Sequence, residues 1–215
     1  MDLAFYEKMA NEWANEEKDR DKQENDYLLE GKFLQITHDD MVNGEGLRTV
    51  LWLSGCEHKC PHCHNPHTWD GNEGLPFTKD YESEFFESLK KDTTDGCTFT
   101  GGDPLFHSNR AFVKNMVLTI KKLYPEKSIW IYTGYTVTEV KSKGCIVLSN
   151  KKGQTMELDW LQYIDVLVDG PFDYELRQKD LENGYDPDYV GSSNQRLIDI
   201  PKSVEKKEII RWEEM

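Results

Sequence analysis

The sequence predicts an α/β fold built around a mostly parallel sheet. Short runs rich in β-branched and aromatic residues alternate along the chain with stretches in which apolar residues recur at helical spacing. Strands that alternate with helices form βαβ units, and these units build parallel sheets. The chain has 215 residues, which corresponds to one domain because domains commonly hold about 100–200 residues. In such folds, reactive groups lie on loops at the carboxyl ends of the strands.

Strands are predicted where a short β-rich run is bounded by polar or turn-forming residues. These runs are 32–37, 50–53, 97–100, 129–133 and 164–168. Two intervening stretches are predicted to be helices that pack on the core, because their apolar residues fall on one face. The first face comprises Phe85, Phe86 and Leu89, and the second comprises Phe112, Val113, Met116, Val117, Ile120 and Leu123.

One stretch departs from this alternation of strands and helices. Two β-rich runs, 145–149 and 154–158, flank the turn-forming residues 150–153. This arrangement predicts a β-hairpin. Because the hairpin does not fit the βαβ pattern, we interpret it as a surface insertion.

Both ends of the chain are dense in charge. Residues 16–22 consist entirely of charged side chains, which predicts that residues 1–30 form a charged, solvated N-terminal extension. Residues 201–215 have a similar composition and are interpreted as a charged C-terminal tail. The main domain is therefore expected to span residues 31–200.

Charge and composition exclude several classes of partner. The chain carries 26 basic and 40 acidic residues, a formal net charge of −14, and such a chain repels phosphate, so we expect no nucleic-acid partner. It contains neither a run of about 18 apolar residues nor a signal-peptide pattern, so we expect no membrane association. The odd count of 5 cysteines argues against a disulfide framework and for the reducing cytoplasm.

Three of these cysteines are clustered directly after the predicted strand 50–53. Cys56, Cys60 and Cys63 have the spacing C-x3-C-x2-C. Thiolates so close on one loop can surround a metal centre, and these soft ligands select zinc, copper(I) or iron–sulfur clusters. Iron–sulfur clusters ordinarily take four cysteines, so three would leave one iron with an open coordination position. Cys97 and Cys145 have no partner at metal spacing and are expected to be buried apolar groups.

Structural zinc is the competing interpretation of the cysteine cluster. Zinc takes four ligands, and four histidines lie close enough in the sequence to complete the set. They are His58, His62, His64 and His67. The cysteine spacing alone leaves both metals open.

A second motif follows the predicted strand 97–100. Gly101 and Gly102 lie at its carboxyl end and are followed by Asp103. Paired glycines let the backbone approach a ligand closely, and a carboxylate beside them can accept charge-assisted hydrogen bonds from an ammonium group. An ordinary turn is the alternative for these three residues.

Together these segments resemble the activating proteins of anaerobic ribonucleotide reductase, a family of radical S-adenosylmethionine enzymes. The cysteine spacing marks the superfamily, and further blocks in the family's order over about residues 33–200 narrow the resemblance. These blocks are 42–46 (VNGEG), 64–69 (HNPHTW), 99–105 (FTGGDPL), 130–135 (WIYTGY), 165–172 (DVLVDGPF) and 191–196 (GSSNQR).

The resemblance implies a fold and a reaction. The fold would be an incomplete (β/α) barrel of the radical S-adenosylmethionine type. A [4Fe–4S] cluster on Cys56, Cys60 and Cys63 would act with S-adenosylmethionine to install a glycyl radical on the large subunit of anaerobic ribonucleoside-triphosphate reductase, with an electron donor such as flavodoxin. An activase of another glycyl-radical enzyme, such as pyruvate formate-lyase, and a zinc-stabilised binding module are the alternatives.

The resemblance also implies where S-adenosylmethionine binds. Gly101, Gly102 and Asp103 would hold its amino end. Thr133, at the end of the strand 129–133, is expected to line the adenosine or ribose pocket. Asp169 is a candidate for positioning the cofactor or the target peptide.

The remaining predicted cofactor-binding residues belong to the cysteine segment. They are His62, Cys63 and His64, of which the two histidines are expected to pack beside the cluster rather than to bind iron. The reductase is expected to contact the segment 170–196. Within that segment, Arg196 either contacts the reductase or pairs with a nearby carboxylate.

Overall fold

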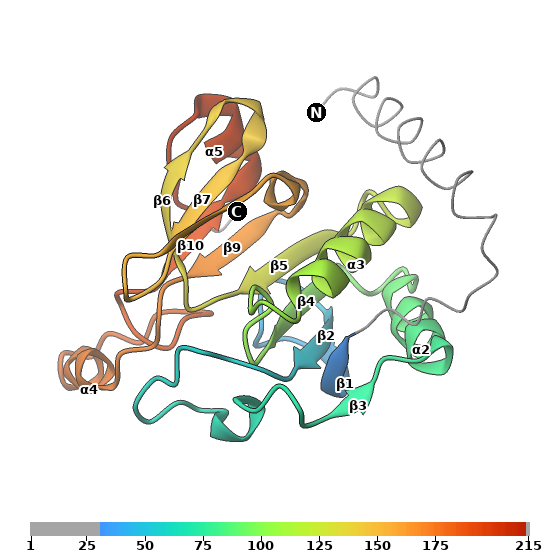
Figure 1. Cartoon of the computed structure of the whole chain (residues 1–215), viewed down its shortest axis with the longest axis horizontal. Helices are drawn as coiled ribbons and strands as arrows, with labels where there is room; N and C mark the ends of the chain where they lie inside the picture. Colours follow the sequence, from blue (N-terminus) through green and yellow to red (C-terminus); the bar gives the residue numbers. More distant parts are fainter. Residues whose placement is uncertain (1–30, 214–215) are drawn as a thin grey trace.

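The computed structural model describes residues 31–213 and contains two sheets. A seven-stranded sheet has the strand order β10-β9-β5-β4-β2-β1-β3, and a three-stranded sheet has the order β6-β7-β8. The predicted extension at residues 1–30 lies outside the described residues. Figure 1 shows the three-stranded sheet, in yellow, at one end of the molecule.

The centre of the large sheet is parallel, as the alternation of strands and helices predicts. Its four inner strands β2, β4, β5 and β9 pair in parallel, and β1, β3 and β10 join antiparallel at the two edges. All five predicted strands are present, with ends that differ by a few residues. The bounds are β1 (Lys32–Asp40), β2 (Arg48–Leu53), β3 (Leu75–Pro76), β4 (Gly96–Gly101), β5 (Ser128–Tyr132), β9 (Val166–Asp169) and β10 (Arg196–Asp199).

The two predicted helices, α2 (Lys79–Leu89) and α3 (Arg110–Leu123), share one core with the sheet. Strand side chains alternate between the two faces, and Leu51, Phe99 and Ile131 of the parallel strands belong to the same buried cluster as the apolar faces of both helices. Leu123 is an exception to the predicted stripe. It is 54% exposed, because α3 ends at this residue and Tyr124 packs against the core instead.

The predicted hairpin is present but is not a surface insertion. β7 (Ile146–Ser149) and β8 (Thr155–Leu158) form it, and a third strand that the sequence did not reveal, β6 (Thr136–Val140), pairs with β7. Ile146 and Leu148 are fully buried in the main core. The interpretation as a surface insertion fails because one face of this sheet belongs to the main core, which also contains Trp160 and Leu161 of the turn η3 (Trp160–Tyr163).

The segment after β10 is packed rather than a free charged tail. The helix α5 (Ile200–Lys206) crosses the predicted boundary at residue 200, and its Ser203 is fully buried. Trp212 donates its N–H to Leu197 O at 2.9 Å and packs edge-on against Trp130 with ring centroids 5.1 Å apart. The contacts of Ser203 and Trp212 hold this segment against the fold. The charged composition of the segment gave no indication of them.

Three short elements complete the described chain. They are the helix α4 (Tyr174–Glu182) and the turns η1 (Pro66–Thr68) and η2 (Ser142–Gly144). Among residues 31–213, no helix has the length and apolar character needed to cross a membrane.

Candidate active site

Three segments meet where the parallel strands β2, β4 and β5 end. They are the cysteine loop (residues 54–65), the Gly-Gly-Asp loop (residues 101–105) and residues 133–135. Together with residues 170–172 and 195 they border a pocket of about 120 Å³. Seven of the predicted site residues line it, namely Cys56, Cys60, Cys63, Gly101, Gly102, Asp103 and Thr133.

The cysteine loop turns sharply before its second and third cysteines. Lys59 and His62, which precede Cys60 and Cys63, have left-handed backbone conformations with φ of 43° and 56°. The N–H of Cys63 donates to Cys60 O at 3.1 Å. Non-glycine residues adopt this conformation only at a cost of about 1–3 kcal/mol, so the surrounding contacts hold the loop in a shape that brings its thiols to one pocket.

Burial favours the protonated form of two thiols of the loop, those of Cys56 and Cys60. Burial, followed by the nearby Asp103 carboxylate, raises the pKa of Cys56 to about 12. Burial also raises the pKa of Cys60. A metal binds thiolates and displaces these protons, and three soft sulfur donors in one pocket fit an iron–sulfur cluster. Within residues 31–213, no three His, Cys, Asp or Glu side chains are arranged to hold a single metal ion.

The Gly-Gly-Asp loop is fastened directly to the cysteine loop. The N–H of Gly102 donates to Leu53 O at 2.7 Å, and the N–H of Asp103 donates to Gly55 O at 2.8 Å. A Cβ on Gly102 would lie 2.5 Å from Gly55 O, closer than any side chain allows. Gly101 has a φ of +96°, which favours glycine. The paired glycines therefore allow the backbones of the two loops to approach each other closely.

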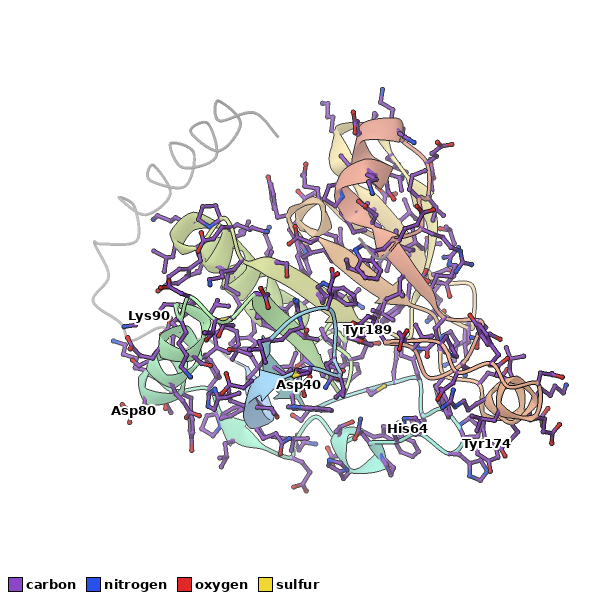
Figure 2. The ribbon with its side chains drawn as sticks, turned by 180° about the vertical axis from the view of Figure 1, so that it is seen from behind. Asp40, His64, Asp80, Lys90, Tyr174 and Tyr189 are labelled. Carbon is purple, nitrogen blue, oxygen red and sulfur yellow. The ribbon has the colours of Figure 1, made fainter. Side chains whose placement is uncertain are left out.

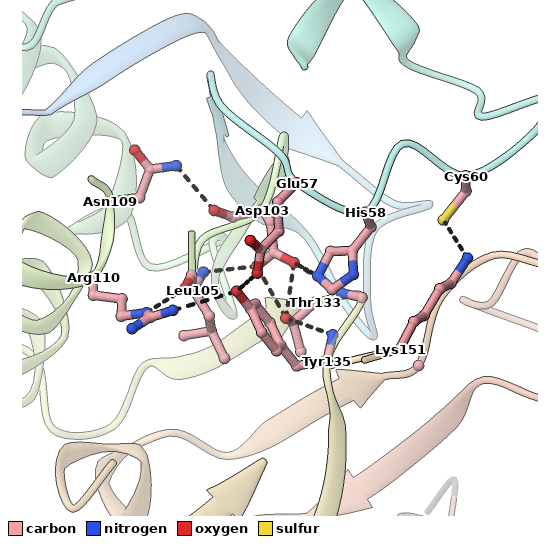
Figure 3. A network of polar contacts seen from close by, with 12 residues as sticks. Glu57, His58, Cys60, Asp103, Leu105, Asn109, Arg110, Thr133, Tyr135 and Lys151 are labelled. Carbon is pink, nitrogen blue, oxygen red and sulfur yellow. Dashed lines mark hydrogen bonds and ion pairs between the residues drawn. The ribbon is translucent and has the colours of Figure 1, made fainter. Parts of the chain in front are cut away.

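The carboxylate of Asp103 is the centre of a hydrogen-bond network (Figure 3). It is 1% exposed and accepts hydrogen bonds from Leu105 N at 2.8 Å, from the Thr133 hydroxyl at 2.9 Å and from Gly134 N at 3.0 Å. His58 Nε2 lies 2.8 Å from Asp103 Oδ2. That contact lacks hydrogen-bond alignment, so this nitrogen has no hydrogen-bond partner within the described residues.

Two further polar atoms of the pocket lining are buried without a partner. They are Trp69 Nε1 and the Tyr132 hydroxyl, and neither has a hydrogen-bond partner among residues 31–213. An unpaired buried polar group costs about 1–3 kcal/mol. With His58, the pocket thus presents three polar groups that a bound polar molecule could pair. This lining fits a ligand that carries carboxylate, hydroxyl or ring-nitrogen acceptors.

A separate bracing contact links the cysteine loop to α3. The Tyr135 hydroxyl donates to the Glu57 carboxylate, and Arg110 Nη2 donates to the same hydroxyl at 3.3 Å. Arg110 lies in the first turn of α3, and Glu57 directly follows Cys56. The contact holds the start of the cysteine loop against the main body of the fold (Figure 3).

The comparisons with known proteins agree with this geometry. The model of the 4Fe-4S single cluster domain matches residues 42–198, a span that contains the cysteine and Gly-Gly-Asp loops. A protein of Enterobacteria phage T4 is 39% identical, with 74% of this chain and 87% of that protein covered. Its name is anaerobic ribonucleoside-triphosphate reductase-activating protein, and proteins of the same name occur in Pasteurella multocida (38% identical; 76% and 94% covered) and Escherichia coli K12 (37%; 73% and 90%). The chain belongs to this family.

The similarity to a solved structure is weaker than the similarity to these sequence relatives. Among solved structures, QueE from Escherichia coli has a TM-score of 0.34 and 18% identity, over 75% of this chain and 81% of that one. The membership of the chain in the family of anaerobic ribonucleoside-triphosphate reductase-activating proteins rests on the sequence relatives and the cluster-domain match.

Three of the residues expected at the site lie outside the pocket lining. His62 stacks on Tyr174 of α4 with centroids 4.0 Å apart, and His64 packs against Phe172 at 4.9 Å. Figure 2 shows His64 and Tyr174 at the same edge of the molecule. Both histidines thus join the cysteine loop to the segment after β9.

Asp169 also faces away from the pocket lining. Its fully buried carboxylate accepts hydrogen bonds from Val137 N at 2.6 Å and from Arg196 Nε at 2.9 Å. Of the two roles expected for Arg196, the structure contains the pairing with a carboxylate. The pair joins β9 and β10 to β6 of the small sheet.

Several residues that line the pocket were given no role from the sequence. They include Thr68, Trp69, Gly170, Phe172 and Gln195, whereas His58 was considered only as a zinc ligand. Most lie in the blocks 64–69, 165–172 and 191–196 that carry the family resemblance. Membership in these blocks is the sequence feature that could have identified them. The contact of Thr68 is visible only in the tertiary structure. Its hydroxyl donates to Gly101 O at 3.0 Å and so links the block 64–69 to the block 99–105.

Proposed function

We propose that this protein uses a [4Fe–4S] cluster and S-adenosylmethionine to install a glycyl radical on the large subunit of anaerobic ribonucleoside-triphosphate reductase. The observation that carries the proposal is the convergence of the cysteine and Gly-Gly-Asp loops on one pocket at the carboxyl ends of the parallel strands. Membership in the activating-protein family supports the choice of reaction and partner.

The cysteine loop would hold the cluster. Cys56, Cys60 and Cys63 would supply three thiolates and leave one iron open to S-adenosylmethionine. When bound, this pair supplies one-electron chemistry that generates a carbon-centred radical able to take a hydrogen atom from a glycine Cα. The protein's task is orientation and the exclusion of water and side reactions.

The Gly-Gly-Asp loop would orient the amino end of S-adenosylmethionine. A carboxylate has about four acceptor positions, and three donors already hold that of Asp103 rigidly in place. The remaining side of the Asp103 carboxylate lies beside His58 Nε2, with which it forms no hydrogen bond. The amino end of the ligand could pair with the carboxylate at this side. Trp69 and Tyr132 would donate to acceptors elsewhere on the cofactor. Because these groups are buried, their interactions with a charged ligand are strengthened by the low local dielectric.

The reductase would approach at the carboxyl ends of the strands. We infer that the seven-stranded sheet is the incomplete (β/α) barrel of the radical S-adenosylmethionine fold, and an incomplete barrel leaves a side through which a glycine-bearing loop can reach the pocket. The electron would come from a small donor such as flavodoxin in the cytoplasm.

Metal content and radical formation test this proposal together. Anaerobically reconstituted protein is expected to contain iron and sulfide in about a four-to-four ratio, where a structural site would hold one zinc. Mixed with the large reductase subunit, S-adenosylmethionine and dithionite, it is expected to produce a glycyl-radical EPR signal. One bound zinc without sulfide, or a loaded cluster without any glycyl radical, would contradict the proposal.

Single substitutions assign the ligands. Cys56→Ala, Cys60→Ala and Cys63→Ala are each expected to abolish the EPR signal of the reduced cluster. Cys97→Ala and Cys145→Ala serve as matched controls. Cys97 is buried inside β4, as expected, whereas Cys145 directly precedes β7 and is only partly buried, contrary to the expectation from the sequence. A full cluster signal in Cys60→Ala would remove that residue from the ligand set.

A further inference from the structure

The turn of the β7–β8 hairpin reaches the cysteine loop. Lys151 Nζ lies 3.9 Å from Cys60 Sγ, a contact between residues 91 positions apart in the chain (Figure 3). The strands behind the turn are anchored in the main core through Ile146 and Leu148. The hairpin thus extends from the core to the pocket that the cysteine thiols line. The spacing of the cysteines gives no sign of this contact.

Hydrogen bonds hold the backbone of the turn on both sides of Lys151. The Asn150 side chain accepts hydrogen bonds from Lys152 N and Gln154 N, both at 3.0 Å. Gly153 N donates to Asn150 O at 2.9 Å, and Gly153 has a left-handed φ of +74°. These contacts brace the turn on both sides of Lys151.

The surroundings of Cys60 make a cation there effective. Cys60 is 7% exposed, and charges interact more strongly where water is largely excluded. Lys151 is the basic side chain whose ammonium contacts this sulfur.

We propose that Lys151 is a positioning residue that places a positive charge on the cluster at Cys60 and thereby raises the reduction potential of the cluster. This inference rests on the proposed function, because it needs the cluster on the cysteine loop. Reduction transfers one electron from an external reductant to the cluster, which lowers the charge of the cluster by one; no bond to the protein breaks. A fixed cation stabilises the reduced form more than the oxidised form.

The reduction potential of the reconstituted holoprotein tests the proposal without any activity measurement. In an EPR-monitored titration with dithionite, Lys151→Gln is expected to shift the potential to more negative values, and Lys151→Glu is expected to shift it further. Lys151→Arg keeps the charge and is expected to remain near the wild-type value. Because surface charges are screened by salt, the shift in Lys151→Gln should shrink as ionic strength rises.

Lys152 provides the matched control, because it is the next residue of the same exposed turn and bears the same charge. Lys152→Gln and Lys152→Glu are expected to leave the potential unchanged. Equal shifts at both positions, or a wild-type potential in Lys151→Gln with full iron and sulfide content, would overturn the role of Lys151 while leaving the proposed function intact. Failure of the wild-type protein to assemble any cluster would overturn both.

Discussion

At the residue level, Asp103 connects segments that are far apart in the chain. Its carboxylate accepts hydrogen bonds from its own loop and from two residues that follow β5. Its backbone N–H donates to the cysteine loop at Gly55 O. The same side chain therefore holds the walls of the pocket together and is the expected partner of the cofactor's ammonium group.

Substitution of Asp103 is expected to affect both stability and cofactor binding. Asp103→Ala leaves three buried donors without an acceptor, and at about 1–3 kcal/mol for each unpaired group we expect a loss of about 2–4 kcal/mol in the free energy of unfolding once water fills part of the gap. Loss of a charge-assisted hydrogen bond of about 1.5–3 kcal/mol should also weaken S-adenosylmethionine binding about 10- to 150-fold.

Two measurements separate these effects. Urea unfolding followed by circular dichroism reports stability, and calorimetric titration of the reconstituted protein reports cofactor affinity. Asp103→Asn preserves the shape of the side chain, so its stability should fall less than that of the alanine variant while its cofactor affinity still drops. Unchanged affinity in both variants would mean that this loop serves only the fold.

At the level of elements, the site depends on how closely the loops after β2 and β4 approach each other. The two strands pair in parallel from Arg48 opposite Gly96 to Leu53 opposite Gly101, so their loops leave the sheet side by side. Gly102 then packs against the backbone of Gly55. The register of the two strands thus determines how the cysteines face the Gly-Gly-Asp loop.

Gly102→Ala tests this close packing. The new Cβ would lie 2.5 Å from a backbone oxygen, so the two loops must separate, and overpacking of this kind costs about 1–3 kcal/mol. We expect a lower denaturation midpoint and a lower yield of reconstituted cluster. Gly71→Ala is the control, because its Cβ would meet its nearest neighbour, the Phe106 ring, at an ordinary 3.4 Å. Equal denaturation midpoints and equal cluster yields in the two variants would show that the close packing of the two loops is not needed for stability or for cluster assembly.

At the level of the whole molecule, one ion pair couples the two sheets. Arg196 of β10 pairs with the buried carboxylate of Asp169 in β9 and also donates to Val137 O of β6 at 2.8 Å. Asp169 in turn accepts from Val137 N. The small sheet carries the hairpin with Lys151, so this pair also helps to place the hairpin relative to the cysteine loop.

Arg196→Ala is therefore expected to destabilise the fold as a whole. Removal of one partner leaves a buried carboxylate without its counter-charge, which costs about 3–5 kcal/mol. Chemical denaturation should show this loss, and cofactor cleavage and glycyl-radical formation should fall together. Replacing both partners with apolar residues, as in Asp169→Leu with Arg196→Met, should recover much of the stability. Loss of radical formation alone, with normal stability and cofactor cleavage, would instead place Arg196 at the reductase contact.

The sequence by itself determined the local structure and the identity of the chemical groups. The helix α3 and the parallel strands follow from the spacing of apolar residues, because helix and strand periodicities are properties of short stretches. The cysteine triplet is equally local, since all three thiols come from one loop. The family blocks then predicted the activating-protein family without any knowledge of contacts.

Only the tertiary structure decided which distant residues meet. The pairing of Asp169 with Arg196, the approach of Lys151 to Cys60 and the burial of the hairpin at Ile146 each join segments that no local pattern connects. These contacts depend on strand order and register, and a shift of one residue in register would turn every side chain of a strand to the opposite face. The charge-dense segment after β10 is packed for the same reason, because the place of Trp212 against Trp130 is set by the sheet beneath it.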